Sequence, residues 1–372
     1  MKMLSPEVKH GIVNRMTGSL FNYQAWPTVT IDEKGTLYAV ASGFRVRHVC
    51  PFGKTVLYIS HDGGNTWTLP TVVNDTYMDD RDAGILYLGQ GKLLLSWFTR
   101  TAREYLTPKY EKMMRAAHPA AVGAVFSMLE GYEHLPEGAE ETASYVRLSE
   151  DYGVTWSEPM RLPISAPHGP CVCKDGRLCY LGTEHNSHGQ LPEGSHAVYT
   201  SYNQGKTWEM TGMFPHPQWT KPECAFSEPH IVELPNGNLL GAIRIDGDGP
   251  FTIATATSTD DGKTWTDPVP TGICGAPPHL MLHSSGALIL SYGRREKPYG
   301  QRAAVSYDYG KTWETEYILD TCDHSFDLGY ASTAELPDGS LITVYYQKCP
   351  GDEQCSILYT KWKLEERNAD TE

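Results

Sequence analysis

The sequence predicts an all-β fold built from six repeated units. Two recurring patterns predict it: an eight-residue motif that occurs five times and a strand–turn–strand pattern that occurs six times. Self-similarity at a regular spacing is typical of architectures that repeat one supersecondary unit. The composition agrees, because 35 Gly and 25 Pro suit many turns, and 22 Tyr and 9 Trp favour strands.

The eight-residue motif reads Ser-x-Asp-x-Gly-x-Thr-Trp, with Asn203 in place of Asp in the third copy. The Asp side chain can accept backbone N–H bonds within its own turn, and the Gly supplies a position with positive φ. The Trp buries a large apolar face that holds the turn against its own sheet. We therefore expect equivalent turns at Ser60–Trp67, Ser149–Trp156, Ser201–Trp208, Ser258–Trp265 and Ser306–Trp313.

The strand–turn–strand pattern occurs before each copy of the motif and once more near the C-terminus. Each copy has an apolar strand, a polar turn with a glycine, and a second apolar strand. Asp-Gly and Asn-Gly turns between such strands are strong hairpin signals. The copies span 25–40, 81–98, 167–182, 228–244, 277–293 and 330–346, with turn glycines at 35, 91, 176, 237, 286 and 339.

The eight-residue motif is the Asp-box, or BNR repeat, and the chain resembles the sialidase (neuraminidase) superfamily of β-propellers. In that family Asp-boxes lie on turns at the rim of the propeller. The resemblance, with six hairpins, implies one six-bladed β-propeller domain over residues 1–372. Asp-boxes indicate the fold more strongly than the chemistry, because carbohydrate-binding and purely structural propellers carry them too.

The sixth hairpin has no Asp-box after it. It is followed by Ser356–Trp362, which we interpret as a third strand. The N-terminal segment around Gly11–Ser19 can supply the outer strand of that blade, which closes the ring and removes exposed edges.

The longest interval between turn glycines contains extra residues at about 101–140, rich in Ala, Met, Glu and Lys. This composition predicts a partly helical insertion in blade two. It is either a lid or wall over the central site, or a subunit contact or surface decoration.

Charge and composition exclude several classes of partner. The net charge of −14 argues against nucleic acid and acidic membranes, so an anionic ligand would need a local basic pocket. The first sixteen residues lack the apolar core of a signal peptide, and no stretch approaches a membrane span. We interpret the nine Cys as reduced, buried thiols and expect a cytoplasmic protein. The oligomeric state is left open.

Polar residues recur where the strands nearest the propeller axis begin. Any one of them is more often structural, but a set at one structural position predicts a binding or catalytic site. Three histidines of the set are candidates for substrate binding. The set comprises Asp79, Asp80, Arg81 and Asp82 in blade two, His168 in three, Glu228 and His230 in four, His279 in five and Tyr330 in six.

The resemblance to sialidases implies roles for part of this set. In that family a tyrosine nucleophile begins the first strand of the last blade, and GYASTAELPDG matches that sequence through Tyr330. The partner glutamate matches Glu228 in SEPHIVELPNG. The arginines that bind the substrate match Arg244, which closes the same hairpin, and Arg302, which precedes the last Asp-box.

The chemistry of these residue types is consistent with that role. A phenol with a pKa near 10 is a poor nucleophile until a carboxylate takes its proton. A tyrosine is preferred to a carboxylate nucleophile when the anomeric centre bears a carboxylate, because two anions repel each other; tyrosine nucleophiles are known among glycosidases. Two arginines can hold a substrate carboxylate through paired hydrogen bonds.

The chain departs from the family pattern in blade one. Ala25-Trp26-Pro27 stands where the family has Arg-Ile-Pro, so one of three carboxylate-binding arginines is absent. The following loop lacks the family's aspartate acid/base. In this region Arg45 is a candidate for substrate binding, and His48 is the nearest group able to donate a proton.

Blade two offers substitutes. Arg81 can replace the missing arginine, and Asp80 or Asp82 can be the acid/base, since clustered carboxylates raise one another's pKa. Alternatively, these aspartates only pair with Arg81. Arg294 and Arg295 either face the site or form a solvated pair.

The leading functional hypothesis is an exo-acting glycoside hydrolase, sialidase-like, that releases a terminal, acidic sugar with retention and uses no cofactor or metal. Its partner is a carbohydrate substrate. One alternative is a glycan-binding propeller without catalysis. The other is a lyase-like or epimerase-like enzyme that uses His48 and the aspartates.

Overall fold

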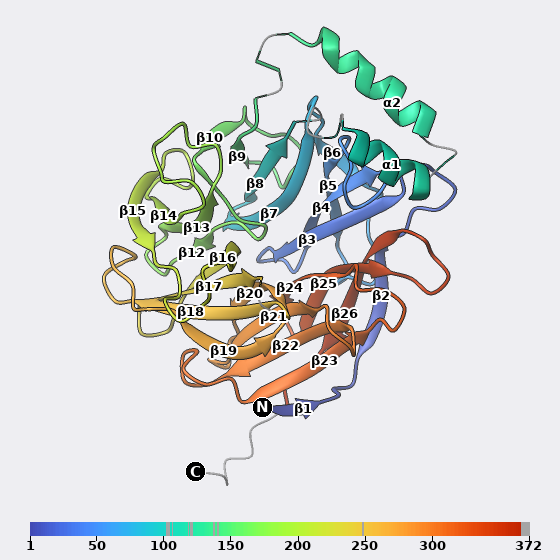
Figure 1. Cartoon of the computed structure of the whole chain (residues 1–372). Helices are drawn as coiled ribbons and strands as arrows, with labels where there is room; N and C mark the ends of the chain where they lie inside the picture. Colours follow the sequence, from blue (N-terminus) through green and yellow to red (C-terminus); the bar gives the residue numbers. More distant parts are fainter. Residues whose placement is uncertain are drawn as a thin grey trace.

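Six sheets stand radially around one axis and form a six-bladed β-propeller in the computed structural model (Figure 1). The structure describes residues 1–101, 105, 107–117, 119, 122–136, 138–139, 141–247 and 249–365. The six predicted hairpins supply the inner two strands of the six blades, and the predicted turn glycines all have positive φ. The fold class inferred from the sequence is therefore confirmed.

The first three blades follow one another along the chain. Blade one consists of β3 (Tyr23–Ile31), β4 (Leu37–Arg45), β5 (Lys54–Ser60) and β6 (Thr71–Asn74). Blade two consists of β7 (Asp79–Gly89), β8 (Lys92–Arg100), β9 (Ser144–Ser149) and β10 (Met160–Leu162). Blade three consists of β11 (Ile164–Ser165), β12 (Cys171–Val172), β13 (Leu178–Glu184), β14 (His196–Ser201) and β15 (Glu209–Phe214).

The last three blades include both ends of the chain. Blade four consists of β16 (Ala225–Glu233), β17 (Leu239–Asp246), β18 (Thr252–Ser258) and β19 (Val269–Cys274). Blade five consists of β20 (Ala276–Leu282), β21 (Leu288–Arg294), β22 (Gly300–Ser306), β23 (Thr315–Thr321) and β1 (Lys2–Leu4). Blade six consists of β24 (Gly329–Glu335), β25 (Leu341–Lys348), β26 (Cys355–Trp362) and β2 (Lys9–Asn14).

The N-terminal segment closes the ring. Strand β2 pairs antiparallel with β26, as predicted, although it ends at Asn14 rather than near Ser19. Strand β1, which the sequence does not predict, adds to blade five in parallel with β23. Pairing the two ends of the chain with neighbouring blades covers edges that would otherwise expose unpaired N–H and C=O groups.

The eight-residue motif forms the turn between the third and fourth strands of the first five blades. In the first copy Oδ1 of Asp62 accepts the backbone N–H of Thr66 at 2.9 Å, and Oδ2 accepts the Thr66 hydroxyl at 2.7 Å. Oγ of Ser60 accepts the N–H of Gly64 at 2.8 Å. These bonds to the Thr66 backbone and hydroxyl lower the pKa of Asp62 to about 2. The turns are therefore self-contained and lie away from the axis.

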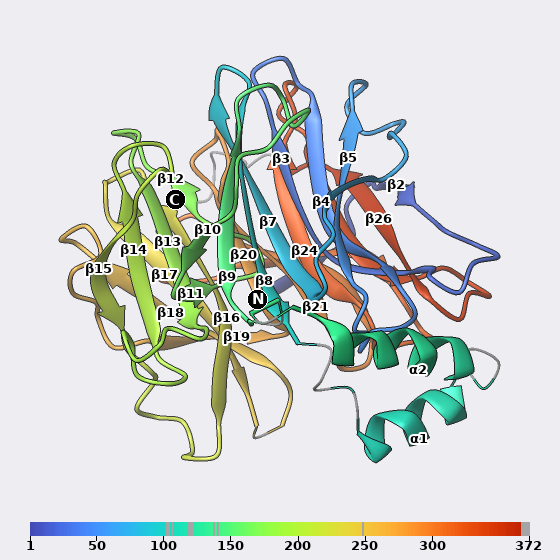
Figure 2. The same cartoon turned by 90° about the horizontal axis from the view of Figure 1, so that it is seen from above.

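The insertion in blade two contains α1 (Pro108–Ala117), α2 (Val122–Glu130) and the 3₁₀ helix η2 (Gly131–His134). Residues 102–104, 106, 118, 120, 121, 137 and 140 of the predicted insertion lie outside the described residues. The helices flank blade one at one end of the propeller and do not cover the axis (Figures 1 and 2). No described helix has the length and apolar character required to cross a membrane.

The insertion packs on the loop that follows β4. Met114, Val125 and Leu129 share an apolar cluster with Val46 and Cys50 of that loop. The hydroxyl of Tyr110 also donates to the carbonyl of Val49 at 3.2 Å. The insertion therefore holds the loop that carries His48, and it acts as a flanking support rather than a lid.

Candidate active site

Five of the described innermost strands carry the same irregularity, because the pairing register shifts by a residue in β3, β7, β16, β20 and β24. In four of them a residue with positive φ occupies the shift: Trp26, Asp82, Glu228 and Tyr330. Their φ values are 57°, 47°, 51° and 52°, a region that non-glycine residues seldom adopt. A bulge re-aims a side chain, and strain of this kind concentrates at functional sites. The four side chains meet at the axis.

Tyr330 and Glu228 are in direct contact. The phenolic hydroxyl of Tyr330 donates a hydrogen bond to Oε1 of Glu228. Burial raises the pKa of Tyr330 well above its ordinary value, and the carboxylates of Glu228 and Asp82 raise it further. Burial opposes ionisation of Glu228, but Arg244 and the bond from Tyr330 lower its pKa overall. The pair is thus a protonated phenol facing an ionised carboxylate.

Two arginines border this pair. Nη1 of Arg244 donates to Oε2 of Glu228 at 2.5 Å, and its Nε donates to Oδ1 of Asp246 at 2.8 Å. Arg295 lies with its Cζ 5.7 Å from the centre of the Tyr330 ring. The Cζ atoms of Arg244 and Arg295 are 4.4 and 5.6 Å from the ring centre of Phe251. The structure therefore brings Arg244 to the site as predicted and places Arg295 beside it.

Arg295 is fixed by its own hydrogen bonds. Its Nε donates to the carbonyl of Leu328 at 2.8 Å, and its Nη2 donates to the hydroxyl of Tyr346 at 3.0 Å. Of the pair Arg294–Arg295 left open by the sequence, Arg295 is the one that faces Tyr330. The blade repeat could have predicted this role of Arg295. Arg295 directly follows β21, the second strand of blade five, and Arg244 lies near the end of β17, the second strand of blade four.

Arg81 lies on the other side of the site. Its Cζ is 4.3 Å from the ring centre of Trp26, and its Nε is 3.8 Å from Oδ1 of Asp82. Within the described residues that buried Nε has no hydrogen-bond partner. A guanidinium positioned by an aromatic ring and not saturated by hydrogen bonds can receive an anionic ligand.

The structure does not place Arg302 in the site. Its Nη1 donates to the carbonyls of Gln301 and Asp320 at 2.9 and 2.8 Å, and its Nη2 donates to the carbonyl of Pro298 at 3.3 Å. The side chain is buried within blade five, with 1% of the residue exposed. The predicted role in substrate binding is corrected, because these carbonyls hold the guanidinium inside its own blade.

Arg45 is near the site, but both of its terminal nitrogens already donate to protein partners. Nη1 and Nη2 donate to Oδ1 and Oδ2 of Asp79 at 2.5 and 3.1 Å, and Nη2 also donates to the carbonyl of His48 at 3.0 Å. Its Cζ is 4.5 Å from the ring centre of Trp26. Arg45 thus supports Trp26 and the His48 loop rather than binding a substrate, which corrects the prediction.

Asp80 and Asp82 differ in role although they are two positions apart. Asp80 accepts from the backbone N–H of Thr76 at 3.0 Å and from Nε1 of Trp97 at 3.1 Å, so it holds a loop inside blade two. This placement corrects its prediction as an acid/base. Asp82 faces Glu228, and its buried Oδ1 has no hydrogen-bond partner within the described residues. Burial raises the pKa of Asp82 to about 6, against the attraction of Arg81.

His48 lies at the edge of the site. Its Nδ1 is 3.0 Å from Oδ1 of Asp327 and 2.8 Å from the hydroxyl of Tyr23. Its ring contacts the edge of Trp26, with ring centres 5.1 Å apart. Burial lowers its pKa, the bond to Asp327 opposes that effect, and Arg81 and Arg295 lower the pKa further.

His230 and His279 have a different role from the predicted substrate binding. Nδ1 of His230 accepts the backbone N–H of Leu280 at 2.9 Å, and Nδ1 of His279 accepts that of Thr333 at 3.3 Å. Each bond joins one blade to the next. Burial lowers the pKa of His230 to about 3 and that of His279 well below its ordinary value. These neutral rings stabilise the packing of blades four, five and six.

His168 belongs to the same layer. Its Nδ1 lies 3.1 Å from Oγ1 of Thr28, and its ring packs at 5.0 Å from His279 and 6.2 Å from Tyr330. Blade two has a glycine, Gly84, next to His168 and Gly169. A Cβ on Gly84 would lie 2.5 Å from the backbone N of Gly169, so a larger residue would separate blades two and three. The predicted ligand contact of His168 is therefore replaced by a structural one below the site.

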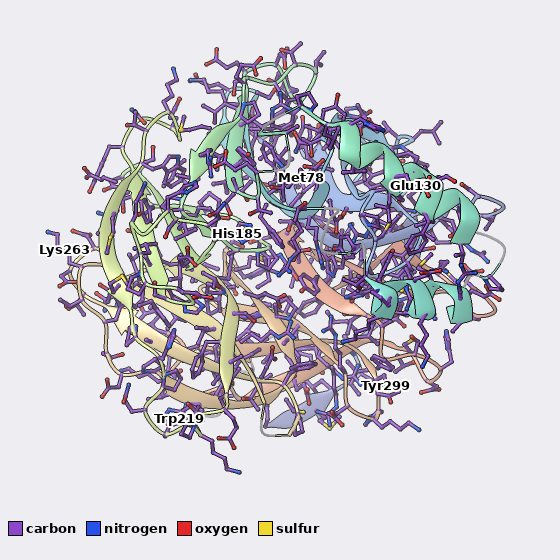
Figure 3. The ribbon with its side chains drawn as sticks, turned by 45° about the horizontal axis from the view of Figure 1, so that its top comes forward. Met78, Glu130, His185, Trp219, Lys263 and Tyr299 are labelled. Carbon is purple, nitrogen blue, oxygen red and sulfur yellow. The ribbon has the colours of Figure 1, made fainter. Side chains whose placement is uncertain are left out.

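Two cavities are lined by neighbours of Tyr330, with Glu228 in one and Arg295 in the other. One, of about 220 Å³, lies between blades two, three and four and is lined by Asp82, Phe98, His185 and Glu228 among others; His185 is labelled near the middle of the ring in Figure 3. The other, of about 520 Å³, is lined by residues of blades one, four, five and six. Its lining comprises Arg47, His48, Val49, Phe251, Arg295, Glu296, Phe326 and Asp327.

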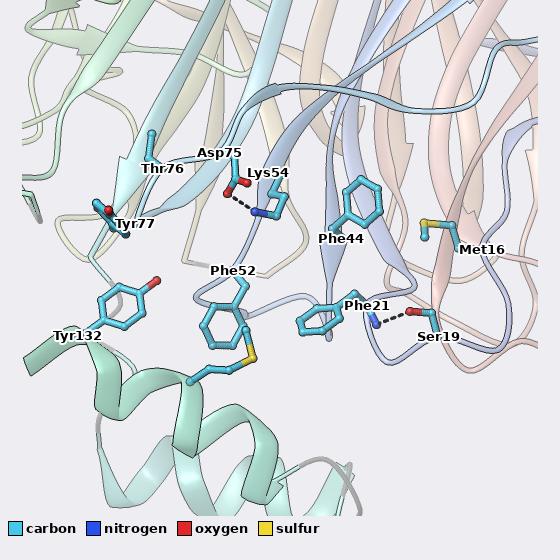
Figure 4. A pocket seen from close by; sticks show the side chains of 11 residues that line it. Met16, Ser19, Phe21, Phe44, Phe52, Lys54, Asp75, Thr76, Tyr77 and Tyr132 are labelled. Carbon is cyan, nitrogen blue, oxygen red and sulfur yellow. Dashed lines mark hydrogen bonds and ion pairs between the residues drawn. The ribbon is translucent and has the colours of Figure 1, made fainter. Parts of the chain in front are cut away.

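A further cavity, also of about 520 Å³, lies between α2 and blade one. Phe21, Phe44 and Phe52 point into it, and Lys54 pairs with Asp75 at its side (Figure 4). Among the described residues, it shares none of its lining with the two cavities near Tyr330. It is therefore a separate feature of the insertion.

The sequence misses three residues of the site. These are Asp327, Phe251 and Tyr346. They surround the arginines and His48, but they lie outside the sialidase-like motifs of Tyr330, Glu228 and the two arginines. Asp327 lies in the loop just before β24, the kind of loop expected to converge on the axis, so its position offers a signal. Phe251 and Tyr346 are aromatic residues in strands or loops with many others and carry no distinguishing signal.

Comparisons with known proteins agree with this architecture. A family model described as a BNR repeat-like domain matches residues 132–344. The anhydrosialidase of Macrobdella decora is 28% identical over 233 residues, which cover 54% of this chain. The match spans less than a third of that relative, 29% of its length.

Solved structures show the same fold at low identity. A protein of unknown function from Dyadobacter fermentans is 23% identical, with a TM-score of 0.74 over 96% of this chain and 99% of that chain. A leech intramolecular trans-sialidase, complexed with 2,7-anhydro-Neu5Ac, is 17% identical, with a TM-score of 0.66 over 95% of this chain and 69% of that chain.

Proposed function

The chain belongs to the family of BNR repeat-like domains, and from this membership and the geometry at Tyr330 we propose that it is a sialidase-like exo-glycoside hydrolase. It releases a terminal acidic sugar from a glycan with retention of configuration. The observation that carries this proposal is the hydrogen bond from Tyr330 to Glu228, a residue that lines one of the two cavities. A structural tyrosine would not require a strained backbone and an ionised partner that is itself held by an arginine.

The three guanidinium groups give the substrate class. Arg81, Arg244 and Arg295 surround Tyr330 in a protein whose net charge is −14, so they form the local basic pocket that an anionic sugar requires. Arg81 takes the place of the arginine absent from Ala25-Trp26-Pro27. A sugar that carries a carboxylate on its ring fits this set, and sialic acids are the first such sugars to test, since two of the similar proteins carry sialidase names.

Tyr330 and Glu228 perform the substitution at the anomeric carbon. The Tyr330 oxygen forms a bond to that carbon while its proton passes to Oε1 of Glu228, and the bond to the leaving glycan breaks. Arg244 holds Oε2 of Glu228, so the carboxylate stays aligned. Water then displaces Tyr330, which recovers its proton from Glu228. Two inversions give net retention.

An activity panel tests this function. Purified protein is assayed with 4-methylumbelliferyl glycosides of N-acetylneuraminic, glucuronic and galacturonic acids, and NMR identifies the anomer first released. The proposal predicts hydrolysis of at least one acidic glycoside with retention, and loss of it in Tyr330→Phe. Binding of these sugars without turnover would favour the glycan-binding alternative, and an unsaturated product would favour a lyase.

A further inference from the structure

We propose that His48, held by Asp327, is the acid/base of the reaction and that the leaving glycan lies in the groove beside it. This inference rests on the proposed function. It replaces Asp82, the other candidate, and assigns a positioning role to Asp327. Three observations carry it: the exposure of the two candidates, the hydrogen bonds around His48 and the cavity beside it.

The first observation concerns depth. An exo-acting enzyme holds the terminal sugar at the closed end of its site, so the leaving glycan points toward solvent and the acid must stand on that side. The side chain of Asp82 is 6% exposed, whereas that of His48 is 40% exposed. Asp82 lies beside Glu228 at the floor and pairs with Arg81. Of the two candidates, only His48 is therefore on the solvent side of the site.

The second observation concerns orientation. Asp327 accepts from the hydroxyl of Tyr23 at 3.0 and 3.1 Å and lies 3.0 Å from Nδ1 of His48. A carboxylate at Nδ1 places a hydrogen on that nitrogen and leaves Nε2 for the transferable proton. The hydroxyl of Tyr346 also donates to Asp327, at 3.3 Å. The imidazole is therefore held in one tautomer and one orientation.

Trp26 relates the imidazole to the nucleophile. His48 packs on the edge of its ring with centres 5.1 Å apart, and Tyr330 packs on the same ring with centres 6.3 Å apart. Both groups therefore border one aromatic ring from different blades. The proposed acid and the nucleophile thus pack on one ring, and the proposal places the sugar between them.

The third observation is the groove. The cavity of about 520 Å³ that contains His48 and Arg295 is also lined by Phe251 and by Phe326, which is 67% exposed. A second cavity, of about 300 Å³, shares the lining residues Arg47, His48 and Asp327 with it. Exposed aromatic faces beside charged groups suit the apolar and hydroxyl faces of sugar rings. The occupant is therefore the glycan attached to the released sugar.

The proton balance is complete. In the first half-reaction Nε2–H of His48 donates its proton to the glycosidic oxygen as that bond breaks. In the second, neutral Nε2 takes a proton from water as the water oxygen bonds to the anomeric carbon and Tyr330 leaves. No oxidant, metal or further reactant takes part.

The charges around His48 predict the pH dependence. Arg81 and Arg295 face it across the site, Arg47 adjoins it, and Glu296, Lys348 and Glu353 line the adjoining cavities. Tyr23 and Asp327 contact the imidazole itself, and Nη2 of Arg45 donates to the carbonyl of His48. The net pKa of His48 lies below 6.5, so the protonated acid is populated only under acidic conditions. Consequently kcat/KM falls as pH rises through that pKa.

Leaving-group dependence tests the assignment. The acidic sugar released fastest in the panel is supplied as its 4-methylumbelliferyl glycoside and as its lactoside. The umbelliferone leaving group needs little protonation to depart, whereas the sugar hydroxyl of lactose must be protonated. His48→Gln should therefore lower kcat/KM by about 100-fold or more on the lactoside. On the aryl glycoside the loss should be under about 10-fold. His61→Gln, on an exposed turn, is the matched control and should leave both unchanged.

Asp327→Asn supplies the second readout. Asp327 supports the charged imidazole, so its removal lowers the pKa of His48 and moves the alkaline fall of kcat/KM to lower pH, which a merely structural role would not do. Equal losses on both substrates in His48→Gln, or the leaving-group pattern in Asp82→Asn instead, would overturn the assignment. A wild type that releases no sugar from any glycoside of the panel overturns the proposed function and the role of His48 with it.

Discussion

Tyr330 and Glu228 are 102 positions apart in the chain, yet the phenol of one donates its hydrogen bond to the carboxylate of the other. They belong to blades six and four, and each occupies a bulge at the start of its innermost strand. The propeller thus brings together two residues that share only a structural position.

Replacement of Tyr330 by Phe removes the nucleophilic oxygen and leaves the ring packing in place. We expect kcat on any cleaved glycoside to fall by about 10²-fold or more, with the melting temperature almost unchanged. Glu228→Gln should cause a comparable loss, and the double variant should lose little more, because the two residues act as one unit. Kinetics and thermal unfolding of the three variants measure this; additive losses would contradict it.

Replacement of Arg81 by Met should weaken binding of the acidic sugar. Loss of a charge-assisted hydrogen bond costs about 1.5–3 kcal/mol, so KM should rise by about 10- to 100-fold. Arg302→Met is the matched comparison: Arg302 is buried among carbonyls of blade five, so its loss should lower the melting temperature without raising KM. A raised KM in Arg302→Met with an unchanged KM in Arg81→Met would instead indicate that Arg302 binds the substrate.

Acidification should destabilise the protein through its buried histidines. His230 has a folded pKa of about 3, whereas the ordinary value is 6.5, so the unfolded chain binds the extra proton between these values. The free energy of unfolding therefore falls as pH drops below 6.5, by about 1.4 kcal/mol per pH unit for this residue. Denaturant titrations between about pH 7 and 4.5 measure the free energy of unfolding. That free energy should fall less steeply with decreasing pH in His230→Gln than in the exposed-site variant His61→Gln.

A methyl group at Gly84 should disrupt the contact between blades two and three. Its Cβ would lie 2.5 Å from the N and 2.7 Å from the Cα of Gly169, which are backbone atoms that cannot rotate away. We expect Gly84→Ala to lower the free energy of unfolding by about 1–3 kcal/mol or more. Gly123→Ala in α2 is the control, because among the described residues a Cβ there would meet no atom within 4 Å outside the backbone of its own helix. Equal stability of the two variants would contradict the close approach.

The blades could be predicted from the sequence because their signals are local. Asp338-Gly339 and the apolar runs around it identify a hairpin without reference to the rest of the chain. The pairing of β2 with β26 followed from the need to close a ring. The pairing of β1 with β23 did not, since three residues with no alternation carry no register signal.

The site could be predicted only in part. Tyr330, Glu228 and Arg244 carry family motifs, and the structure brings them together. The prediction that Arg302 binds the substrate was wrong, because a sequence position does not show which backbone carbonyls a buried guanidinium contacts.

The histidines show a second limit. His230 and His279 looked like a convergent polar set, yet their partners are backbone N–H groups of the next blade, which no side-chain pattern reveals. Asp80 likewise accepts from Trp97 of its own blade, whereas Asp82 lies in the bulge of β7 and near Glu228.

The most direct test of the central claim is to trap the covalent intermediate. An acidic glycosyl fluoride with a second fluorine beside the anomeric carbon slows the second half-reaction, so a nucleophile remains bonded to the sugar. Digestion and mass spectrometry should then find the sugar on Tyr330, with no adduct in Tyr330→Phe. Turnover of the probe with the sugar on another residue, or with no adduct at all, would contradict the account.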